Sequence, residues 1–157
     1  MCGRSNIFNR TTLIRVTSWW LIKQLIRLKF PKIQQLSTAD LATWLLDENK
    51  PQPLLLDART IEEYQVSHLP NAKLVRGDLQ ELIAGIDYKQ PIVAYCSVGY
   101  RSSAIARRLE ALGYQNVFNL EGSIFQWVNE SRPVYHQGKS VSEVHPYQEF
   151  WQHLLLD

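Results

Sequence analysis

The stretch IVAYCSVGYRSS, residues 92–103, contains the junction on which the predicted fold depends. Its first residues form a continuous apolar run, which is typical of a strand buried on both faces of a parallel sheet. A short polar loop follows, and then a segment of helical character that begins near Ser102 and ends at Gly113. Cys96 stands directly after the apolar run. The stretch therefore predicts a strand, a loop that carries one thiol, and a helix.

The same alternation of apolar runs and helical patterns extends over most of the chain. The runs expected to be strands cover residues 54–58, 72–75, 92–95 and 116–120. Helical patterns cover residues 37–50, 60–66, 78–85, 102–113 and 122–130. Strands that alternate with helices favour an α/β fold, in which helices cover both faces of a parallel sheet. The segment PKIQQL, residues 31–36, is interpreted as a linker that precedes this pattern.

Length and composition set the limits of the interpretation. A chain of 157 residues with 45% hydrophobic residues suits one domain with a modest extension. Its two cysteines, Cys2 and Cys96, cannot form a disulfide framework, which favours a reducing compartment, and we expect a cytoplasmic protein. The chain has no Cys-x-x-Cys or His-x-x-x-His pair and its histidines are scattered, so we expect no metal site and no cofactor.

Charge is distributed unevenly along the chain. Residues 1–39 contain seven basic residues and no acid, whereas all fifteen acids lie in residues 40–157. The asymmetry marks residues 1–35 as a basic N-terminal arm. Within this arm, residues 13–30 place most of their apolar residues on one side of a helix, although basic residues interrupt that side.

Three interpretations of the arm stay open at this point. In the first, the arm is a helix that makes peripheral contact with an anionic membrane through residues 13–30. In the second it is a transit peptide that targets an organelle, and in the third it is a helix packed on the domain. Nucleic acid is not an expected partner, because no reading motif accompanies the basic residues.

The position of Cys96 suggests a chemical role. Ligands of parallel sheets bind beyond the carboxyl ends of the strands, where this cysteine lies. Backbone N–H groups of a curled loop and the positive end of the following helix both favour an anion, so we expect the pKa of Cys96 to be lowered and its thiolate to act as a nucleophile. A free cysteine at a strand end is also commonly a buried structural residue, and that alternative remains open from position alone.

Three blocks of the sequence resemble the rhodanese-like sulfurtransferases. The loop CSVGYRS (96–102) resembles the family's active-site loop, Cys-x-x-Gly-x-Arg-Ser. The segments LLLDARTIEEYQVSHLPNA (54–72) and LEGSIFQWVNESRPV (120–134) resemble two further family segments, in the family's order. The resemblance covers about residues 36–135 and points to single-domain thiosulfate sulfurtransferases. Departures from the family pattern that leave the nucleophile intact are Ala58, Ile61, Ser67, Asn71 and Glu121.

The resemblance implies a fold and a division of the chain. It implies a five-stranded, mainly parallel sheet with helices on both faces over residues 36–135. The basic amphipathic helix of residues 1–35 precedes this domain, and a C-terminal extension, residues 136–157, follows it. The extension has a helical pattern after Pro146, and we expect it either to cover the apolar side of the arm or to dock a partner. Because every matching block lies after the arm, we expect the arm to be dispensable for sulfur transfer.

The resemblance also implies a reaction. The thiolate of Cys96 takes a sulfane sulfur from a small donor such as thiosulfate, forms a persulfide, and passes the sulfur to a thiol or a protein acceptor. No cofactor or metal takes part. The residues expected to bind the substrate around the sulfur are Ser97, Val98, Gly99, Tyr100 and Arg101.

Asp57 and Arg59 are predicted to support the loop. We expect Arg101 to pair with Asp57 and brace the loop from beneath, with a role in attracting the anionic donor as the alternative. We expect Arg59 to have a structural role in an ion pair with Glu62 or Glu63, with a role in helping the anionic donor enter as the alternative.

Two functions other than sulfur transfer are compatible with parts of this pattern. Tyrosine phosphatases resemble this loop but use Cys-x5-Arg and place a histidine before the cysteine, whereas here four residues separate Cys96 from Arg101 and Tyr95 precedes the cysteine. A non-catalytic or regulatory rhodanese-like interaction module usually lacks the cysteine. This second alternative remains open beside the enzyme.

Overall fold

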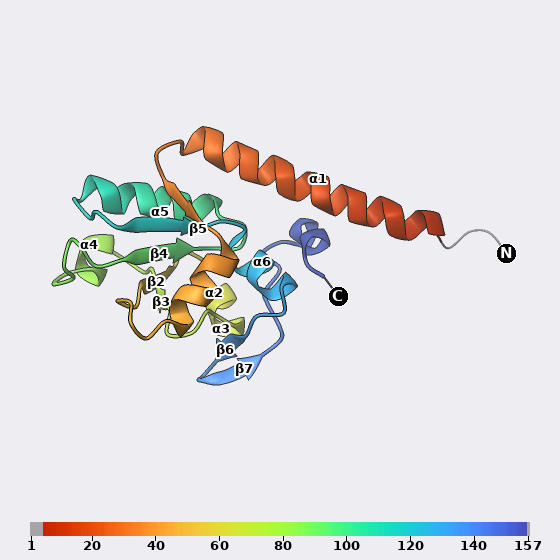
Figure 1. The fold of residues 1–157 in the computed structure, drawn as a ribbon. Helices are drawn as coiled ribbons and strands as arrows, with labels where there is room; N and C mark the ends of the chain where they lie inside the picture. Colours follow the sequence, from red (N-terminus) through yellow and green to blue (C-terminus); the bar gives the residue numbers. More distant parts are fainter. Residues whose placement is uncertain (1–4, 157) are drawn as a thin grey trace.

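The computed structural model describes residues 5–156, so Cys2 lies outside the described residues. Its centre is a five-stranded sheet of order β1-β5-β4-β2-β3 in which each pairing is parallel (Figure 1). The strands are β1 (Gln34–Leu36), β2 (Leu54–Asp57), β3 (Lys73–Leu74), β4 (Ile92–Tyr95) and β5 (Val117–Leu120). The α/β fold and the parallel sheet expected from the sequence are therefore confirmed.

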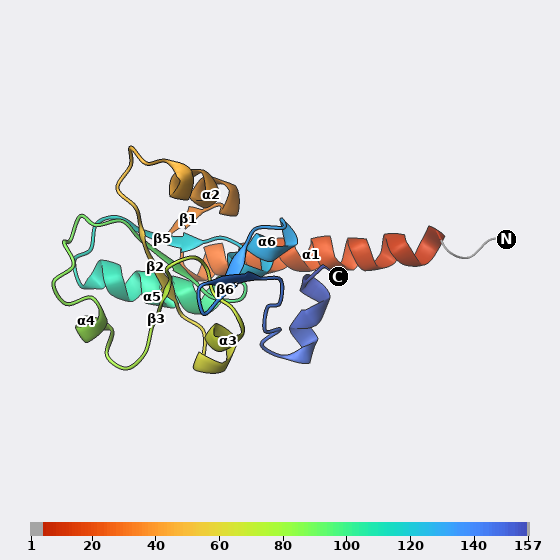
Figure 2. The same ribbon diagram turned by 90° about the horizontal axis from the view of Figure 1, so that it is seen from below.

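Helices cover both faces of the sheet (Figures 1 and 2). They are α1 (Ser5–Lys29), α2 (Thr38–Leu46), α3 (Ile61–Val66), α4 (Leu79–Leu82), α5 (Tyr100–Ala111) and α6 (Ser123–Asn129). Their starts follow local chemistry: the side chain of Ser37 accepts a hydrogen bond from the backbone of Asp40, and Thr60 and Glu63 form a capping box at α3. The helix predicted for residues 78–85 is shorter than expected and ends at Leu82.

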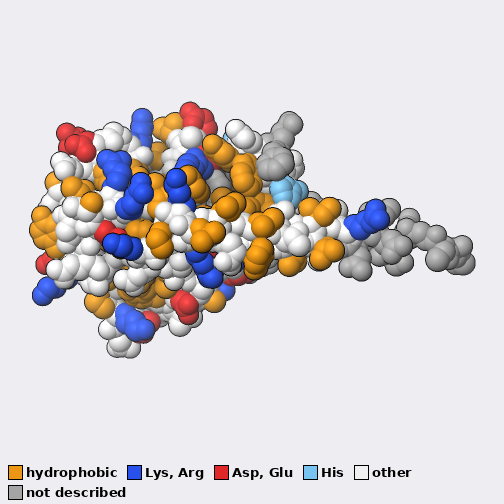
Figure 3. All heavy atoms as spheres, turned by 90° about the horizontal axis from the view of Figure 1, so that it is seen from above, with side chains coloured by type: hydrophobic (Ala, Val, Ile, Leu, Met, Phe, Trp, Pro, Cys, Tyr) orange, Lys and Arg blue, Asp and Glu red, His pale blue; other side chains and the backbone are white. Residues whose placement is uncertain are grey.

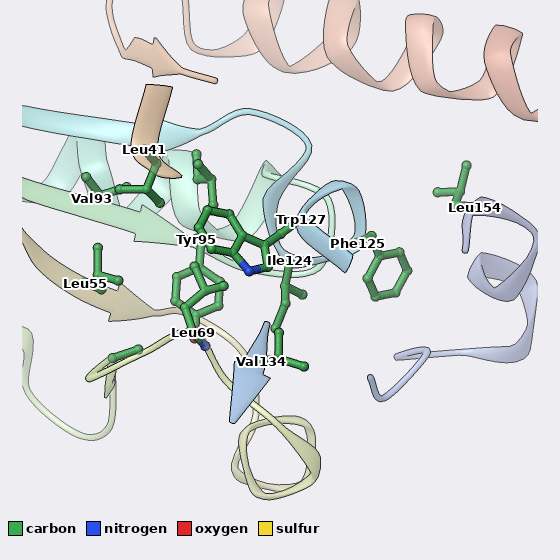
Figure 4. Packing of buried hydrophobic residues seen from close by; sticks show 12 residues of the cluster. Leu41, Leu55, Leu69, Val93, Tyr95, Ile124, Phe125, Trp127, Val134 and Leu154 are labelled. Atoms are coloured by element: carbon green, nitrogen blue, oxygen red, sulfur yellow. The ribbon is translucent and has the colours of Figure 1, made fainter. Parts of the chain in front are cut away.

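Alternate side chains of the buried strands pack in two separate hydrophobic clusters, one on each face of the sheet. Val93 and Tyr95 of β4 pack in the cluster shown in Figure 4, together with side chains from α2 and α6. Ile92 faces the other cluster, which it shares with side chains from α1, α4 and α5. Because successive strand residues point to opposite faces, a continuous apolar run is what a strand between two helical layers needs.

The first strand corrects the sequence interpretation. Residues 31–36 were interpreted as a linker, but Gln34–Leu36 form β1 and pair with β5 at the edge of the sheet. This strand lacks an apolar run because it has a neighbour on one side only, and its exposed positions tolerate glutamine. Periodicity alone therefore could not detect it.

The arm is not separate from the domain. Ile26, Phe30 and Ile33 are buried in the second cluster, and Trp19 and Ile22 pack against the core from one side of α1. Lys23 and Arg27 both form ion pairs with Glu121, which follows β5. The interpretation of a packed helix therefore describes the second half of α1, whereas its first half projects beyond the body of the protein (Figures 1 and 2). No described helix is long and apolar enough to cross a membrane.

The C-terminal extension differs from the helix that was expected. A hairpin of β6 (Val134–His136) and β7 (Lys139–Val141) follows the domain, and the segment after Pro146 forms a short 3-10 helix, η1 (Glu149–Leu154). The element η1 contacts α1, and Leu154 is fully buried in the cluster of Figure 4. Of the two expected roles of the extension, the structure thus shows contact with the arm.

Gly99 decides where α5 begins. It takes a φ of 110°, in the left-handed region, and α5 starts directly after it, earlier than the sequence suggested. A Cβ atom at this position would lie 3.2 Å from the side-chain nitrogen of Asn119 and 3.4 Å from Cδ1 of Ile26. The turn therefore requires glycine for both its backbone conformation and its close contacts.

Gly99→Ala should destabilise the protein more than Gly138→Ala. Gly138 also has a positive φ, of 76°, but has open space around it, so its substitution measures the backbone cost alone, roughly 1–2 kcal/mol. Crowding at Gly99 should add about 1 kcal/mol or more to the loss of unfolding free energy. Urea denaturation of both variants measures the difference, and equal losses would contradict the crowding argument.

Candidate functional site

The thiol of Cys96 lies at the carboxyl end of β4 and is surrounded by hydrogen-bond donors. The residue is only 1% exposed. The backbone N–H of Gly99 donates to Sγ at 3.2 Å, and the hydroxyl of Ser102 lies 3.5 Å from the same atom. A loop that curls around the sulfur was expected from the sequence, whereas the hydroxyl of Ser102 was not.

The pKa of Cys96 is lowered from its ordinary value. Burial, the largest influence, raises this pKa, but it is outweighed by the positive charge of Arg101 and by hydrogen bonds from Ser102 and from the backbone of Gly99. The direction is the one expected from the loop and helix start. The surroundings therefore favour the thiolate form of Cys96 more than water does, although the residue is buried.

The segment that begins α6 holds the backbone of the cysteine in place. The N–H of Cys96 donates to the hydroxyl of Ser123 at 3.1 Å. The N–H groups of Ile124 and Phe125 donate to the carbonyls of Cys96 and Ser97, each at 3.1 Å. Ser123 was not identified from the sequence, although it lies in the block LEGS that follows the last strand. Its role depends on a contact between segments far apart in the chain.

Arg101 braces the loop through a different partner from the one predicted. It does not pair with Asp57; its guanidinium donates to both carboxylate oxygens of Glu63, at 2.8 Å each. Ser97 joins the pair, because its hydroxyl donates to Glu63 at 2.8 Å and accepts from Arg101 at 2.9 Å. Glu63 is 1% exposed and is fixed at the start of α3 by its capping box. The paired side chains thus tie α3 to both ends of the loop.

Asp57 and Arg59 form a second buried network beneath the first. Arg59 does not pair with Glu62 or Glu63 as expected; its guanidinium binds the carboxylate of Asp57, and both side chains are fully buried. The hydroxyl of Tyr95 also donates to Asp57, at 2.5 Å, and Arg59 donates to the carbonyl of Ser67 at 2.6 Å. Burial first, and then the charge of Asp57, raise the pKa of Tyr95, which keeps its hydroxyl protonated. The network fixes the residue that directly precedes Cys96.

A cavity of about 630 Å³ opens above the sulfur. Cys96, Ser97, Val98, Tyr100 and Arg101 from the predicted site line it, whereas Gly99 contributes its N–H to the sulfur. The remaining wall was missed by sequence reasoning, and it is formed by Ile22, Leu25, Ile26, Leu28 and Lys29 of α1 and by Tyr147 and Trp151 of the extension. The guanidinium of Arg101 lies 4.4 Å from the centre of the Tyr147 ring. The wall is mostly apolar.

This arrangement supports nucleophilic chemistry at the sulfur. Within residues 5–156, no cluster of three or more His, Cys, Asp and Glu side chains has the geometry to hold a metal. The site combines a stabilised thiolate, inward N–H and hydroxyl donors and a cavity that admits a small molecule. These are the parts that covalent catalysis by cysteine requires.

A comparison with protein families adds to this geometry. The family model of the rhodanese-like domain matches residues 38–130, which is more than half of the chain. The chain belongs to the rhodanese-like family. The match includes Cys96 and its bracing residues but leaves out α1 and the C-terminal extension of this rhodanese-like protein, which form the apolar wall.

Individual relatives include sulfurtransferases. The chain is 31% identical over 103 residues to the putative sulfurtransferase YtwF of Bacillus subtilis, a match that covers 65% of this chain and 97% of that protein. It is 30% identical over 107 residues to the tRNA uridine(34) hydroxylase of Erwinia tasmaniensis, which covers 61% of this chain and 30% of that protein. This chain thus spans about a third of the length of that hydroxylase.

Solved structures show the same fold. The polysulfide-sulfur transferase homodimer of Wolinella succinogenes is 28% identical with a TM-score of 0.59, over 73% of this chain and 87% of that one. A rhodanese-like domain protein from Staphylococcus aureus is also 28% identical, with a TM-score of 0.55, over 71% of this chain and 99% of that one. These similarities place the domain in the general sulfur-transfer family.

The lowered pKa of Cys96 predicts how the thiol reacts as pH changes. In a Cys2→Ser background, the rate of alkylation by iodoacetamide should rise with a midpoint below that of a free thiol, about 8.5. The reason is that the folded protein favours the thiolate, so reactivity persists as pH falls until it passes the lowered pKa. Stopped-flow or mass-spectrometric rates across pH measure the midpoint.

A matched pair of variants tests whether the charge of Arg101 lowers the pKa of Cys96. Arg101→Gln removes the charge that lowers the pKa and should move the alkylation midpoint upward. Arg107→Gln makes the same change on the exposed side of α5, where the arginine lies over Phe30, and should leave the midpoint unchanged. A wild-type midpoint at or above that of a free thiol would contradict the argument.

Glu63 predicts a specific loss of stability in acid. Burial, the largest influence, raises its pKa, but hydrogen bonds from Arg101 and Thr60, the charge of Arg101 and the hydroxyl of Ser97 lower it to about 2. Because the folded pKa lies below the ordinary 4.5, the stabilisation is fully present above pH 4.5 and is lost as pH falls towards 2.

Glu63→Gln should remove this stabilisation. At neutral pH we expect a loss of about 3 kcal/mol in the free energy of unfolding, shrinking as the pH is lowered through this window. Urea denaturation at about pH 7, above the window, and at about pH 3, within it, measures the change. Glu62→Gln, a neighbouring exposed position, serves as the control and should change little. A loss for Glu63→Gln that does not depend on pH would show that the carboxylate charge is not the cause.

Proposed function

We propose that this protein is a sulfurtransferase in which Cys96 accepts a sulfane sulfur from a donor such as thiosulfate and transfers it to a thiol or protein acceptor. The observation that carries the proposal is the sulfur of Cys96, which lies at a cavity and within hydrogen-bond distance of the N–H of Gly99 and the hydroxyl of Ser102. Membership of the rhodanese-like family and the similarity to sulfurtransferases support it.

The reaction proceeds in two displacements. The Cys96 thiolate attacks the outer sulfur of thiosulfate, a new S–S bond forms, and sulfite leaves with the electron pair of the old S–S bond. An acceptor thiolate, or cyanide in an assay, then attacks the outer sulfur of the persulfide, and the Cys96 thiolate leaves. In each step a negatively charged sulfur occupies the same position. The hydrogen-bond donors of the loop stabilise that charge.

The bracing residues give the loop its stability during this exchange. The Glu63–Arg101 pair holds Ser97, and Ser123 holds the N–H of Cys96, so the sulfur stays at a fixed position while its substituent changes. The positive charges of Arg101 and Lys29 at the cavity favour an anionic donor such as thiosulfate.

A non-catalytic interaction module is the alternative. Such a module has no need of a thiol with a lowered pKa at the floor of a cavity, and this property favours the enzyme. The similarity to tRNA uridine(34) hydroxylases covers less than a third of their length and adds no observation that favours their activity here.

Persulfide formation tests the proposal. Incubation with thiosulfate should add about 32 Da, one sulfur atom, to Cys96, and thiocyanate should form when cyanide is supplied. Cys96→Ser should abolish both the adduct and the thiocyanate, because the nucleophile is lost. Cys2→Ser, the only other cysteine substitution the chain offers, should retain both. Intact protein mass spectrometry and thiocyanate assays provide the readouts, and activity retained in Cys96→Ser would refute the mechanism.

A further inference from the structure

The helix α1 is apolar on two opposite sides. Its inner side, which includes Trp19, Ile22 and Ile26, packs on the domain. Its outer face consists of large side chains that are between 52% and 78% exposed: Leu13, Ile14, Val16, Trp20, Leu21, Leu25 and Leu28. At 100° per residue these positions spread over about half the circumference of the helix, and the middle of that arc lies opposite the inner side. A helix that is apolar all round is normally covered on every side, so the outer face calls for a partner.

The outer face forms a continuous surface. Figure 3, seen from above α1, shows hydrophobic side chains gathered along the helix, with several Lys and Arg side chains beside them on the same face. The first half of the helix extends beyond the body of the protein, where neither the sheet nor the other helices cover it (Figures 1 and 2). A partner with a flat, extended surface fits this long exposed face better than a small ligand does.

Charge indicates which kind of surface this is. Residues 1–39 contain no acid at all, so no carboxylate on α1 repels an anionic partner. Arg10 and Lys29 are exposed towards the two ends of α1, and the side chain of Arg27 is 52% exposed although it contacts Glu121. Basic residues that flank exposed leucine and tryptophan are typical of helices that lie in the headgroup region of anionic membranes.

We propose that the outer face of α1 binds the surface of a membrane that contains anionic lipids. The helix lies parallel to that surface, with Trp20 and its leucine neighbours at the level of the headgroups and the basic side chains against lipid phosphates. The domain remains outside the lipid on the opposite side of the helix, since the inner side of α1 is already covered by it.

In this orientation the membrane also lies close to the Cys96 cavity. Leu25 and Leu28 belong to the outer face and at the same time line the cavity above Cys96. A membrane on the outer face therefore lies beside the opening of this cavity. Exchange of sulfur with a molecule held at the membrane follows from that placement and rests on the proposed function, whereas membrane binding itself does not.

Flotation with vesicles tests the proposal on the full chain. We expect the protein to float with vesicles of phosphatidylcholine and phosphatidylglycerol, not with phosphatidylcholine alone, and to be released by salt. The double variant Trp20→Gln, Leu21→Gln should weaken partitioning at least about tenfold, because two large apolar side chains no longer enter the interface. Leu46→Gln, at a leucine of α2 that is 83% exposed and lies outside α1, is the control and should float as the wild type does.

A second readout locates the contact. Brominated lipids should quench the fluorescence of the bound protein, and Trp20→Phe should lose most of that quenching while still floating. Equal binding to neutral vesicles would contradict the requirement for anionic lipids. No flotation of the wild type, with a dimer that the double variant dissociates in sedimentation velocity, would assign the outer face to a second copy of this chain instead.

The outcomes separate this proposal from the proposed function. Trp20 and Leu21 do not line the Cys96 cavity, so the double variant should form the Cys96 persulfide in solution as the wild type does. Loss of flotation with the persulfide retained supports membrane binding through α1. Absence of the persulfide from the wild type refutes sulfur transfer and leaves the flotation result to stand on its own.

Discussion

The ion pair between Glu63 and Arg101 is the interaction on which the reactive loop depends. A loop that directs N–H groups towards one sulfur gives up hydrogen bonds that would otherwise hold its own backbone, so it needs support from outside. Glu63 supplies that support from the first turn of α3, where its own position is fixed by the capping box with Thr60. Because one carboxylate binds Arg101, Ser97 and the backbone of Thr60, the loop and the helix hold one another in place.

Three elements thus converge on one thiol. The strand β4 delivers Cys96, the start of α6 binds its backbone through Ser123, and the start of α5 contributes Ser102. The charge of Arg101 serves two purposes here, because it pairs with Glu63 and also lowers the pKa of Cys96. The structural brace and the electrostatic activation of the nucleophile are therefore the same side chain.

The surroundings of the site come from outside the family match. Residues 38–130 provide the sheet, the loop and the brace, while α1 and the extension add an apolar wall above the sulfur. These two segments contact each other and bury Leu154 and Phe30 in the core, so they are part of the folded domain. Part of the lining of the cavity above Cys96 is thus supplied by elements that lie outside the family match.

The sequence by itself determined the parallel α/β fold and the position of Cys96, because buried strands, helix caps and the loop pattern are local signals. It did not determine β1, whose edge position removes the apolar signal. Nor did it identify the partners of Arg101 and Asp57: several acids follow the strands at similar spacing, and only the packed chain decides which carboxylate lies within 3 Å of which guanidinium. The two sides of α1 were likewise decided by tertiary structure, because a helix with apolar residues all round does not reveal which side the domain will cover.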